Sequence, residues 1–177
     1  MTAPAGIGVL GWLARWRVRL GALTVVAALI LARPTWTSWR AGLAIALAGE
    51  AIRIWAAGHL EKSREVTRSG PYRWTAHPLY VGSSVLALGV VVAAASLPLA
   101  ALAFVYMTAT ITAAVRTEEA HLREAFGSTY DDYRASRAQP MARQFSLARA
   151  MRNREYRALA GVVLGFALLA LRVLGPL

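Results

Sequence analysis

The chain has 177 residues, of which 57% are hydrophobic and only 16% are charged, where soluble domains carry about 25% charged residues. A soluble fold of this size could not bury so much apolar surface, so the composition predicts a protein that lies in a membrane. The absence of cysteine excludes disulfides, thiolate metal sites and cysteine nucleophiles. Three scattered histidines do not form a metal-ligand cluster, so we expect no metal site.

Five apolar blocks predict an all-α fold, a polytopic membrane bundle of about five transmembrane helices with further helices at its cytoplasmic face. We expect a single integral membrane domain over residues 1–177, with spans at about 20–32, 41–57, 79–96, 98–115 and 158–174. The first block is short, and a cleaved signal peptide is the alternative, but the residues from Arg33 to Trp36 make a poor cleavage site. Ser96-Leu97-Pro98 predicts a tight turn between the third and fourth spans.

The distribution of basic residues predicts the orientation. The chain has 20 Lys plus Arg against 9 Asp plus Glu, a net charge of +11. Sixteen of the basic residues fall before the first span or in residues 58–77 and 116–157, against three on the opposite side. The positive-inside rule therefore places the N-terminus in the cytoplasm. These charges lie between apolar blocks, where arginine contacts lipid headgroups, so we expect membrane lipids as partners and no nucleic acid.

The chemistry is expected at the cytoplasmic face, because the sizeable segments outside the spans are residues 58–78 and 116–157. Within residues 146–157, Leu147 and Met151 lie four apart among arginines, which predicts an interfacial helix on anionic lipid. The alanine- and arginine-rich composition is typical of a prokaryote with GC-rich DNA. We therefore expect an integral protein of a bacterial inner (plasma) membrane.

Two charges fall inside the second predicted span. Glu50 and Arg53 are three residues apart, so they share one face of that helix. Charges at such depth are costly unless they are paired, and they are candidates for function. Both a structural ion pair and a direct role in binding a ligand stay open.

The first informative stretch runs from Ser69 to Gly82 into the third predicted span. Gly70-Pro71 predicts a turn, and Pro78 suits the first turn of the following helix. The stretch also places one imidazole and several aromatic rings at the membrane interface. Each aromatic residue alone is typical of an interfacial belt, but the cluster as a whole favours a site.

The second informative stretch leaves the fourth span at Arg116. On a continuing helix Arg116 and Glu119 are three residues apart, and Glu119 and Arg123 are four apart in the order that favours an ion pair. A solvated, salt-bridged face would explain these charges without any function. Gly127 suits the C-cap of this helix, and Ser128 the N-cap of the next.

Two motifs therefore occur in order on either side of a predicted helical hairpin. They read GPYxxxxHPxYxG at residues 70–82 and RxEExxLxxxFG at residues 116–127, the second followed by Tyr130 and Tyr133. With the Gly-x-x-Ile-Arg-x-Trp pattern at residues 49–55, they resemble the superfamily of isoprenylcysteine carboxyl methyltransferases and phospholipid methyltransferases. The resemblance covers about residues 49–140.

The resemblance implies an integral membrane methyltransferase that uses S-adenosylmethionine, releases S-adenosylhomocysteine and acts at the cytoplasmic face. The acceptor would be a lipophilic small molecule or a lipid that enters from the bilayer. The residues carried over to cofactor binding are Tyr72, His77, Pro78, Tyr80, Gly82, Glu118, Glu119 and Tyr130. The candidate catalytic residues are His77, Arg116, Glu119 and Arg53.

The chemistry agrees with this composition, because methyl transfer from a sulfonium needs no metal and no cysteine, only alignment of the reacting atoms. Carboxylates can bind the ribose diol or the α-ammonium group of the cofactor, and an arginine can pair with its carboxylate. An amine or thiol acceptor needs a base, for which His77 is the candidate. A carboxylate acceptor needs an arginine instead, and Arg53, Arg73 or Arg116 could serve.

Three alternatives stay open. Transfer to the amino group of a phospholipid is the enzymatic alternative to other lipophilic acceptors. A non-catalytic membrane scaffold or sensor is suggested by Ala76, which precedes His77 where the family usually has arginine. A small transporter is suggested by the intramembrane charges Glu50 and Arg53.

Overall fold

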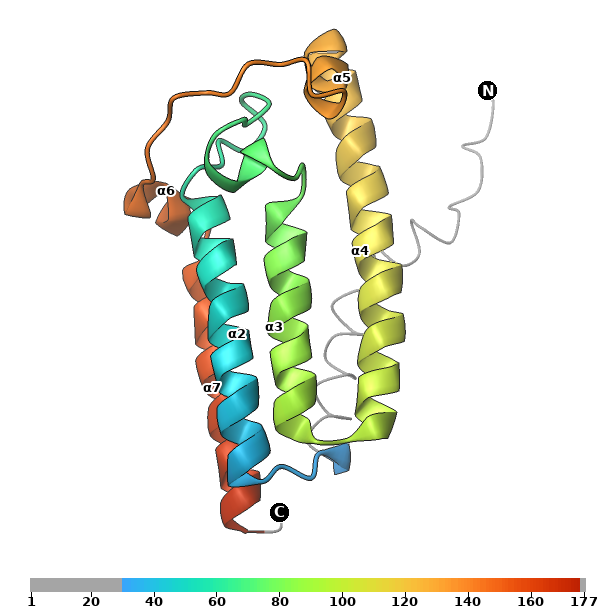
Figure 1. The fold of residues 1–177 in the computed structure, drawn as a ribbon, viewed down its shortest axis with the longest axis vertical. Helices are drawn as coiled ribbons and strands as arrows, with labels where there is room; N and C mark the ends of the chain where they lie inside the picture. Colours follow the sequence, from blue (N-terminus) through green and yellow to red (C-terminus); the bar gives the residue numbers. More distant parts are fainter. Residues whose placement is uncertain (1–29, 176–177) are drawn as a thin grey trace, which may run out of the picture.

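The computed structural model describes residues 30–175, and this part of the chain is helical without a strand. Four long helices run along the molecule (Figure 1), and three short ones lie at one of its ends. The long helices are α2 (Trp36–Ala57), α3 (Pro78–Ala94), α4 (Leu97–Phe126) and α7 (Tyr156–Leu174). The short ones are the 3₁₀ helix η1 (Gly70–Arg73), α5 (Ser128–Arg134) and α6 (Leu147–Arg152). The all-α prediction is confirmed for the described residues.

Consecutive long helices run antiparallel, with α2 between α3 and α7 and with α4 beside α3 (Figure 1). Glycines allow α2 and α3 to approach closely: a Cβ atom on Gly49 would collide with the backbone of α3, and one on Gly82 or Gly89 with the backbone of α2. Towards the other end of the bundle, Trp39 on α2 donates its indole N–H to the carbonyl oxygen of Phe166 on α7 (2.9 Å).

Two described helices, α4 and α7, are long and apolar enough to cross a membrane, fewer than the five spans predicted. The 22-residue α2 is interrupted by Arg40, Glu50 and Arg53, and the apolar α3 has 17 residues. The predicted span at residues 20–32 lies almost entirely outside the described residues. In the most apolar 18-residue stretch of α4, only 11% is buried within the protein, and Phe104 on this helix is 73% exposed. A helix so apolar and so little covered by protein fits a membrane protein.

The helix ends predicted from Pro78 and Gly127 agree with the structure, but α2 begins at Trp36, five residues before the predicted span. Pro78 begins α3, and α3 and α4 are joined by a tight turn in which Ala95 adopts a left-handed φ of 48°. Gly127 forms the C-cap of α4 with a φ of 49°. The prediction for Ser128 is wrong, because Gly127 also occupies the N-cap of α5 and Ser128 is the first residue of that helix.

The helix expected over residues 146–157 is also different in the structure. Helix α6 ends at Arg152, and Arg154 turns the chain with a left-handed φ of 61° before α7 begins. Leu147 and Met151 are exposed apolar residues, as an interfacial helix requires. Arg149, however, contacts protein rather than solvent, because it donates to Glu61 (2.8 Å).

We call one end of the bundle the loop end, where residues 58–77, α5, the extended segment 135–146 and α6 gather (Figure 1). The segment 135–146 crosses this end from α5, which lies at the tip of α4, to α6, which lies beside α2. Both motif-bearing stretches therefore meet at one end of the molecule.

Candidate active site

A cavity of about 480 Å³ opens at the loop end. Its wall comes from several separate parts of the chain: residues 60–67, the η1–α3 connection, the second half of α4, helix α5 and the turn before α7. Of the predicted site residues, those on this wall are Tyr72, His77, Pro78, Tyr80, Glu118 and Tyr130. Ala76 also lies on the wall. The volume is in the range of sites for small ligands, about 300–1,000 Å³.

His77 is fixed between the start of α3 and the face of α4. It is the N-cap residue of α3, immediately before Pro78. Its Nε2 atom lies 3.3 Å from Oε1 of Glu119, and its Nδ1 atom lies 3.8 Å from Oε2 of Glu118. Nδ1 is buried and has no hydrogen-bond partner among the described residues. When Nε2 carries the proton and donates to Glu119, Nδ1 is left with a free lone pair.

Glu119 lies behind His77 rather than on the cavity wall, and two arginines hold it. Arg134 from α5 approaches its Oε1 atom (3.3 Å), and Arg123 approaches its Oε2 atom (3.7 Å). The Glu119–Arg123 pair is the one that the four-residue spacing predicts. These contacts fix the carboxylate in place, so that it can orient the imidazole.

Four tyrosines form the aromatic part of the wall: Tyr72, Tyr80, Tyr130 and Tyr133. Tyr133 donates its hydroxyl to the carbonyl oxygen of Tyr72 (2.7 Å), which ties α5 to η1. Burial raises the pKa of Tyr133 to about 12 and raises that of Tyr72 further, so both phenols stay protonated at neutral pH. Tyr130 is fully buried, and its hydroxyl has no hydrogen-bond partner within the described part of the chain.

The structure places three other predicted site residues away from this wall. Gly82 packs against Gly49 and Arg53 of α2. Arg116 is exposed on α4. Arg53 is turned towards two carboxylates and the hydroxyl of Ser83, to which it donates.

The ion pair between Glu50 and Arg53 is confirmed, with Nε and Oε2 3.6 Å apart. The structure adds a third member that was not predicted, Glu155, whose Oε1 atom lies 2.6 Å from Nη2 of Arg53. Glu155 lies one residue before α7 and contributes to the cavity wall. Its distance in sequence from Arg53 gives no local pattern from which this contact could be found.

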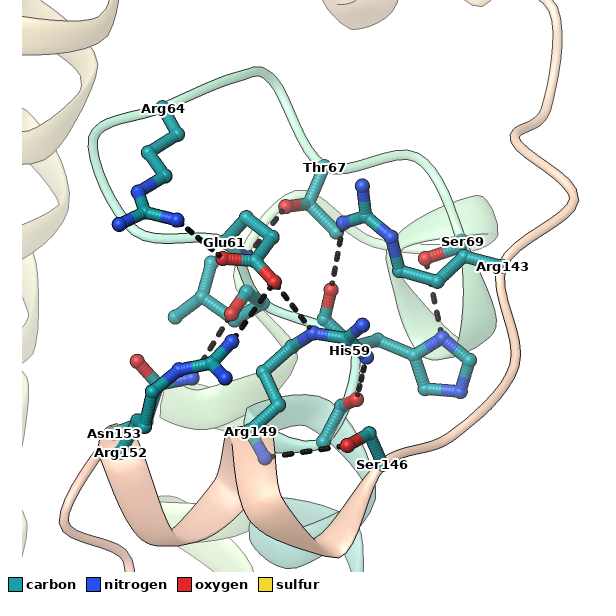
Figure 2. A network of polar contacts seen from close by, with 12 residues as sticks. His59, Glu61, Arg64, Thr67, Ser69, Arg143, Ser146, Arg149, Arg152 and Asn153 are labelled. Atoms are coloured by element: carbon teal, nitrogen blue, oxygen red, sulfur yellow. Dashed lines mark hydrogen bonds and ion pairs between the residues drawn. The ribbon is translucent and has the colours of Figure 1, made fainter.

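A second group of charged residues holds residues 58–69 in place. We call it the clamp; its members are Glu61 and Glu65 on the loop and Arg143, Arg149 and Arg152 on the C-terminal segment. Arg143 binds both oxygens of Glu65 (2.5 and 2.8 Å), and Arg149 and Arg152 meet at Oε1 of Glu61 (2.8 and 3.1 Å). Figure 2 shows Arg149 and Arg152 converging on Glu61 from α6. The hydrogen bond from Arg149 lowers the pKa of Glu61, and the bond to Glu65 raises that of Arg143.

Because Glu61 and Glu65 lie on the cavity wall and the arginines do not, the clamp positions one wall of the cavity from outside. No motif in the sequence indicates the members of the clamp. The one available signal is the excess of arginine in residues 116–157, which is equally typical of topology and lipid contact.

His59 lies inside the clamp and gives it a pH dependence. It is 5% exposed, its Nδ1 atom lies 3.1 Å from Oγ of Ser69, and its ring lies near Phe145 (Figure 2). Burial lowers its pKa below the ordinary 6.5, and the charges of Arg149 and Arg143 lower it further. Below pH 6.5 the unfolded chain therefore binds more protons than the folded protein, and stability falls as the pH decreases through the folded pKa.

We expect the thermal unfolding temperature to drop between about pH 7.5 and about pH 5, and His59→Gln to reduce that drop. Melting curves of the detergent-purified protein at both pH values measure it. His121→Gln, at an exposed histidine, is the matched control and should keep the wild-type drop. An unchanged drop in His59→Gln would show that other groups cause the acid sensitivity.

Comparison with known families identifies the chain. Residues 16–129 match the family described as phospholipid methyltransferase, and this range contains the Glu50–Arg53 pair and both motifs. Neither a curated protein nor a solved structure matches the chain significantly. Since the match covers more than half of the sequence, the chain belongs to the phospholipid methyltransferase family, within the superfamily of membrane methyltransferases that its two motifs indicate.

Proposed function

We propose that the protein transfers a methyl group from S-adenosylmethionine to the amino group of a phospholipid or related lipophilic amine, and that the reaction takes place in the loop-end cavity. The observation that carries the proposal is His77, which lies on the wall of a cavity bounded by both family motifs and is held from behind by Glu119. The positive-inside argument further favours a cytoplasmic loop end and, with it, a cytoplasmic N-terminus in a bacterial inner membrane.

The residues around the cavity fit the methyl donor. Its sulfonium supplies an electrophilic methyl group, and transfer leaves the neutral thioether S-adenosylhomocysteine. Glu118 offers a carboxylate for a ribose diol or an ammonium group, and the rings of Tyr72 and Tyr80 suit a cation. The buried Tyr130 hydroxyl lacks a partner within the described chain, and a buried polar group of this kind gains from a ligand that satisfies it.

An amine acceptor agrees with the charges on the cavity wall. A carboxylate acceptor would need a guanidinium group, but no arginine lines this cavity in residues 30–175. Arg53 is paired with two glutamates, Arg73 donates to the carbonyl oxygen of Met141 (3.3 Å), and Arg116 is exposed. The wall instead carries four carboxylates against one lysine, which favours a positively charged ligand.

Within this proposal, the chain's residues handle one proton. Glu119 holds His77 in the tautomer that leaves the lone pair of Nδ1 free beside Glu118, and Nδ1 accepts a proton from the acceptor's ammonium group. The released nitrogen lone pair then forms the new N–C bond, while the electron pair of the breaking C–S bond stays on sulfur. Exclusion of water by the aromatic wall and alignment of the two substrates supply the rest of the rate enhancement.

The hydrocarbon part of the acceptor has a suitable surface nearby. A second, apolar pocket of about 630 Å³ lies between α3 and α4, with Ala87, Leu88 and Phe104 on its wall. Its first residue on α3, Ser84, is one helical turn beyond Tyr80 of the loop-end cavity. A lipid chain bound there would bring its headgroup to His77.

Titration calorimetry of S-adenosylhomocysteine into the detergent-purified protein tests the cofactor class. We expect saturable binding that Glu118→Gln weakens about tenfold, since a hydrogen bond to a charged group is worth about 1.5–3 kcal/mol. Glu124→Gln, an exposed glutamate two turns further along α4, is the matched control and should bind as the wild type does. Absence of binding in a folded wild-type protein would contradict the proposal.

A further inference from the structure

The turn between α6 and α7 brings a carboxylate to the cavity from beyond the segment that matches the family. Asn153 donates its side-chain amide to the carbonyl oxygens of Ala57 (2.8 Å) and Leu60 (2.9 Å), at the end of α2. Arg154 then takes its left-handed conformation, which most side chains disfavour. Glu155 follows, 6% exposed and on the cavity wall. The turn is thus fixed to α2 on both sides of Arg154, by Asn153 and by the Glu155–Arg53 pair.

Two carboxylates face the single guanidinium group of Arg53. One guanidinium group serves Glu155 (2.6 Å) and Glu50 (3.6 Å), and Glu50 is 2% exposed with no hydrogen bond to either oxygen from the described residues. When both carboxylates are ionised, the three side chains carry one net negative charge. A buried charge is costly unless it is compensated, and the cavity beside Glu155 is where a compensating cation can enter.

Two other groups on the wall point to the same kind of ligand. Tyr72, Glu118 and Glu155 line the same cavity, and the two carboxylates add to the rise in the pKa of Tyr72 that burial causes. The fully buried hydroxyl of Tyr130, on the same wall, has no protein partner in residues 30–175. The other two carboxylates of the wall, Glu61 and Glu65, already have the arginines of the clamp.

We propose that Glu155 is a ligand-binding residue of the cavity and that, with Glu118 and Tyr72, it binds a positively charged sulfonium or ammonium group. An aromatic ring beside carboxylates is a favourable environment for such a cation. The inference rests on the proposed function, and the cation it assigns to Glu155 is either the sulfonium of the methyl donor or the ammonium group of the acceptor; the donor's own ammonium group is left out, because S-adenosylhomocysteine carries it as well. It adds a residue that the family match, ending at residue 129, does not contain.

The test compares a cationic ligand with a neutral one of the same shape. For the methyl donor, calorimetry measures the affinity of the wild type and of Glu155→Gln for S-adenosylmethionine and for S-adenosylhomocysteine. Methylation of phosphatidylethanolamine in nanodiscs at saturating donor gives KM for the acceptor arm. Glu155→Asp is a second variant that keeps the charge but withdraws it from the cavity, and Glu124→Gln is the control for charge alone. Circular dichroism and a melting curve show that each variant is folded.

If the sulfonium is the cation, we expect Glu155→Gln to weaken binding of S-adenosylmethionine about tenfold more than binding of S-adenosylhomocysteine. If the acceptor's ammonium group is the cation, we expect the variant to raise KM for phosphatidylethanolamine about tenfold. Either change corresponds to about 1.4 kcal/mol. Glu155→Asp should change the same binding constant or KM in the same direction but by a smaller factor. If Glu155→Gln does not fold, the result for Glu155→Asp tests the inference. Equal changes for the two nucleosides together with an unchanged KM would overturn the inference but leave the proposed function intact. Failure of the wild type to bind or methylate would overturn both.

Discussion

His77→Ala is expected to lower kcat for an amine acceptor by about 10²–10⁴-fold, the usual contribution of a positioned base, while S-adenosylhomocysteine still binds. The reason is the geometry of the imidazole, whose Nε2 atom faces Glu119 while its Nδ1 atom has no hydrogen-bond partner within the described residues. The measurement is transfer of a labelled methyl group to phosphatidylethanolamine in nanodiscs, with cofactor affinity measured in parallel. The variant therefore separates the chemical step from binding.

Glu119→Gln refines this test. Glutamine can still accept the hydrogen bond from Nε2, but it carries no charge to stabilise the imidazolium, so we expect a smaller loss in kcat, about tenfold. The exposed Glu124→Gln again controls for the loss of one negative charge on α4. If His77→Ala methylates every accepted amine lipid as fast as the wild type does, His77 is not the base.

The second large effect is expected at the clamp. Arg143→Ala removes two hydrogen bonds to Glu65 and one to the carbonyl oxygen of His59 (3.2 Å), and we expect a loss of stability of about 2 kcal/mol. Since Glu65 lies on the cavity wall, we also expect weaker binding of S-adenosylhomocysteine and faster proteolysis within residues 58–69. Melting curves and timed proteolysis measure the two effects.

Arg137→Ala is the matched control for the clamp. Arg137 also pairs with a carboxylate, Asp132 (2.8 Å), but both side chains are about half exposed (66% and 49%), and exposed pairs contribute about 0–1 kcal/mol. It should therefore melt as the wild type does and resist proteolysis equally. If Arg143→Ala is no more sensitive than Arg137→Ala, the C-terminal segment does not hold the cavity wall.

The clamp also explains why the expectation for residues 146–157 was only partly right. Arginines beside apolar residues are typical of a helix on anionic lipid, and the exposed Leu147 and Met151 keep that pattern. Arg149, however, reaches Glu61 and the carbonyl oxygen of Gly58 (2.5 Å). Sequence distance hides such a contact, since 88 residues separate Arg149 from Glu61.

The sequence alone determined the features that depend on local chemistry. The apolar blocks predicted helices, and Pro78 and Gly127 predicted helix ends. Because a helix fixes which neighbours share a face, the sequence spacing also predicted two ion pairs within single helices, Glu50–Arg53 and Glu119–Arg123. The two motifs also indicated the family that the comparison shows. Of the five predicted spans, α4 and α7 are long and apolar enough to cross a membrane within the described residues, whereas α2 carries charges and α3 is short.

Tertiary structure alone decided what meets across the bundle. It placed Gly82 at the contact between α2 and α3 rather than on the cavity wall, and it set Glu119 behind His77 while Glu118 faces the cavity. It also brought Glu155 to Arg53. These outcomes depend on how helices pack and on where turns direct the chain, and no spacing within a single segment encodes contacts between segments that are a hundred residues apart.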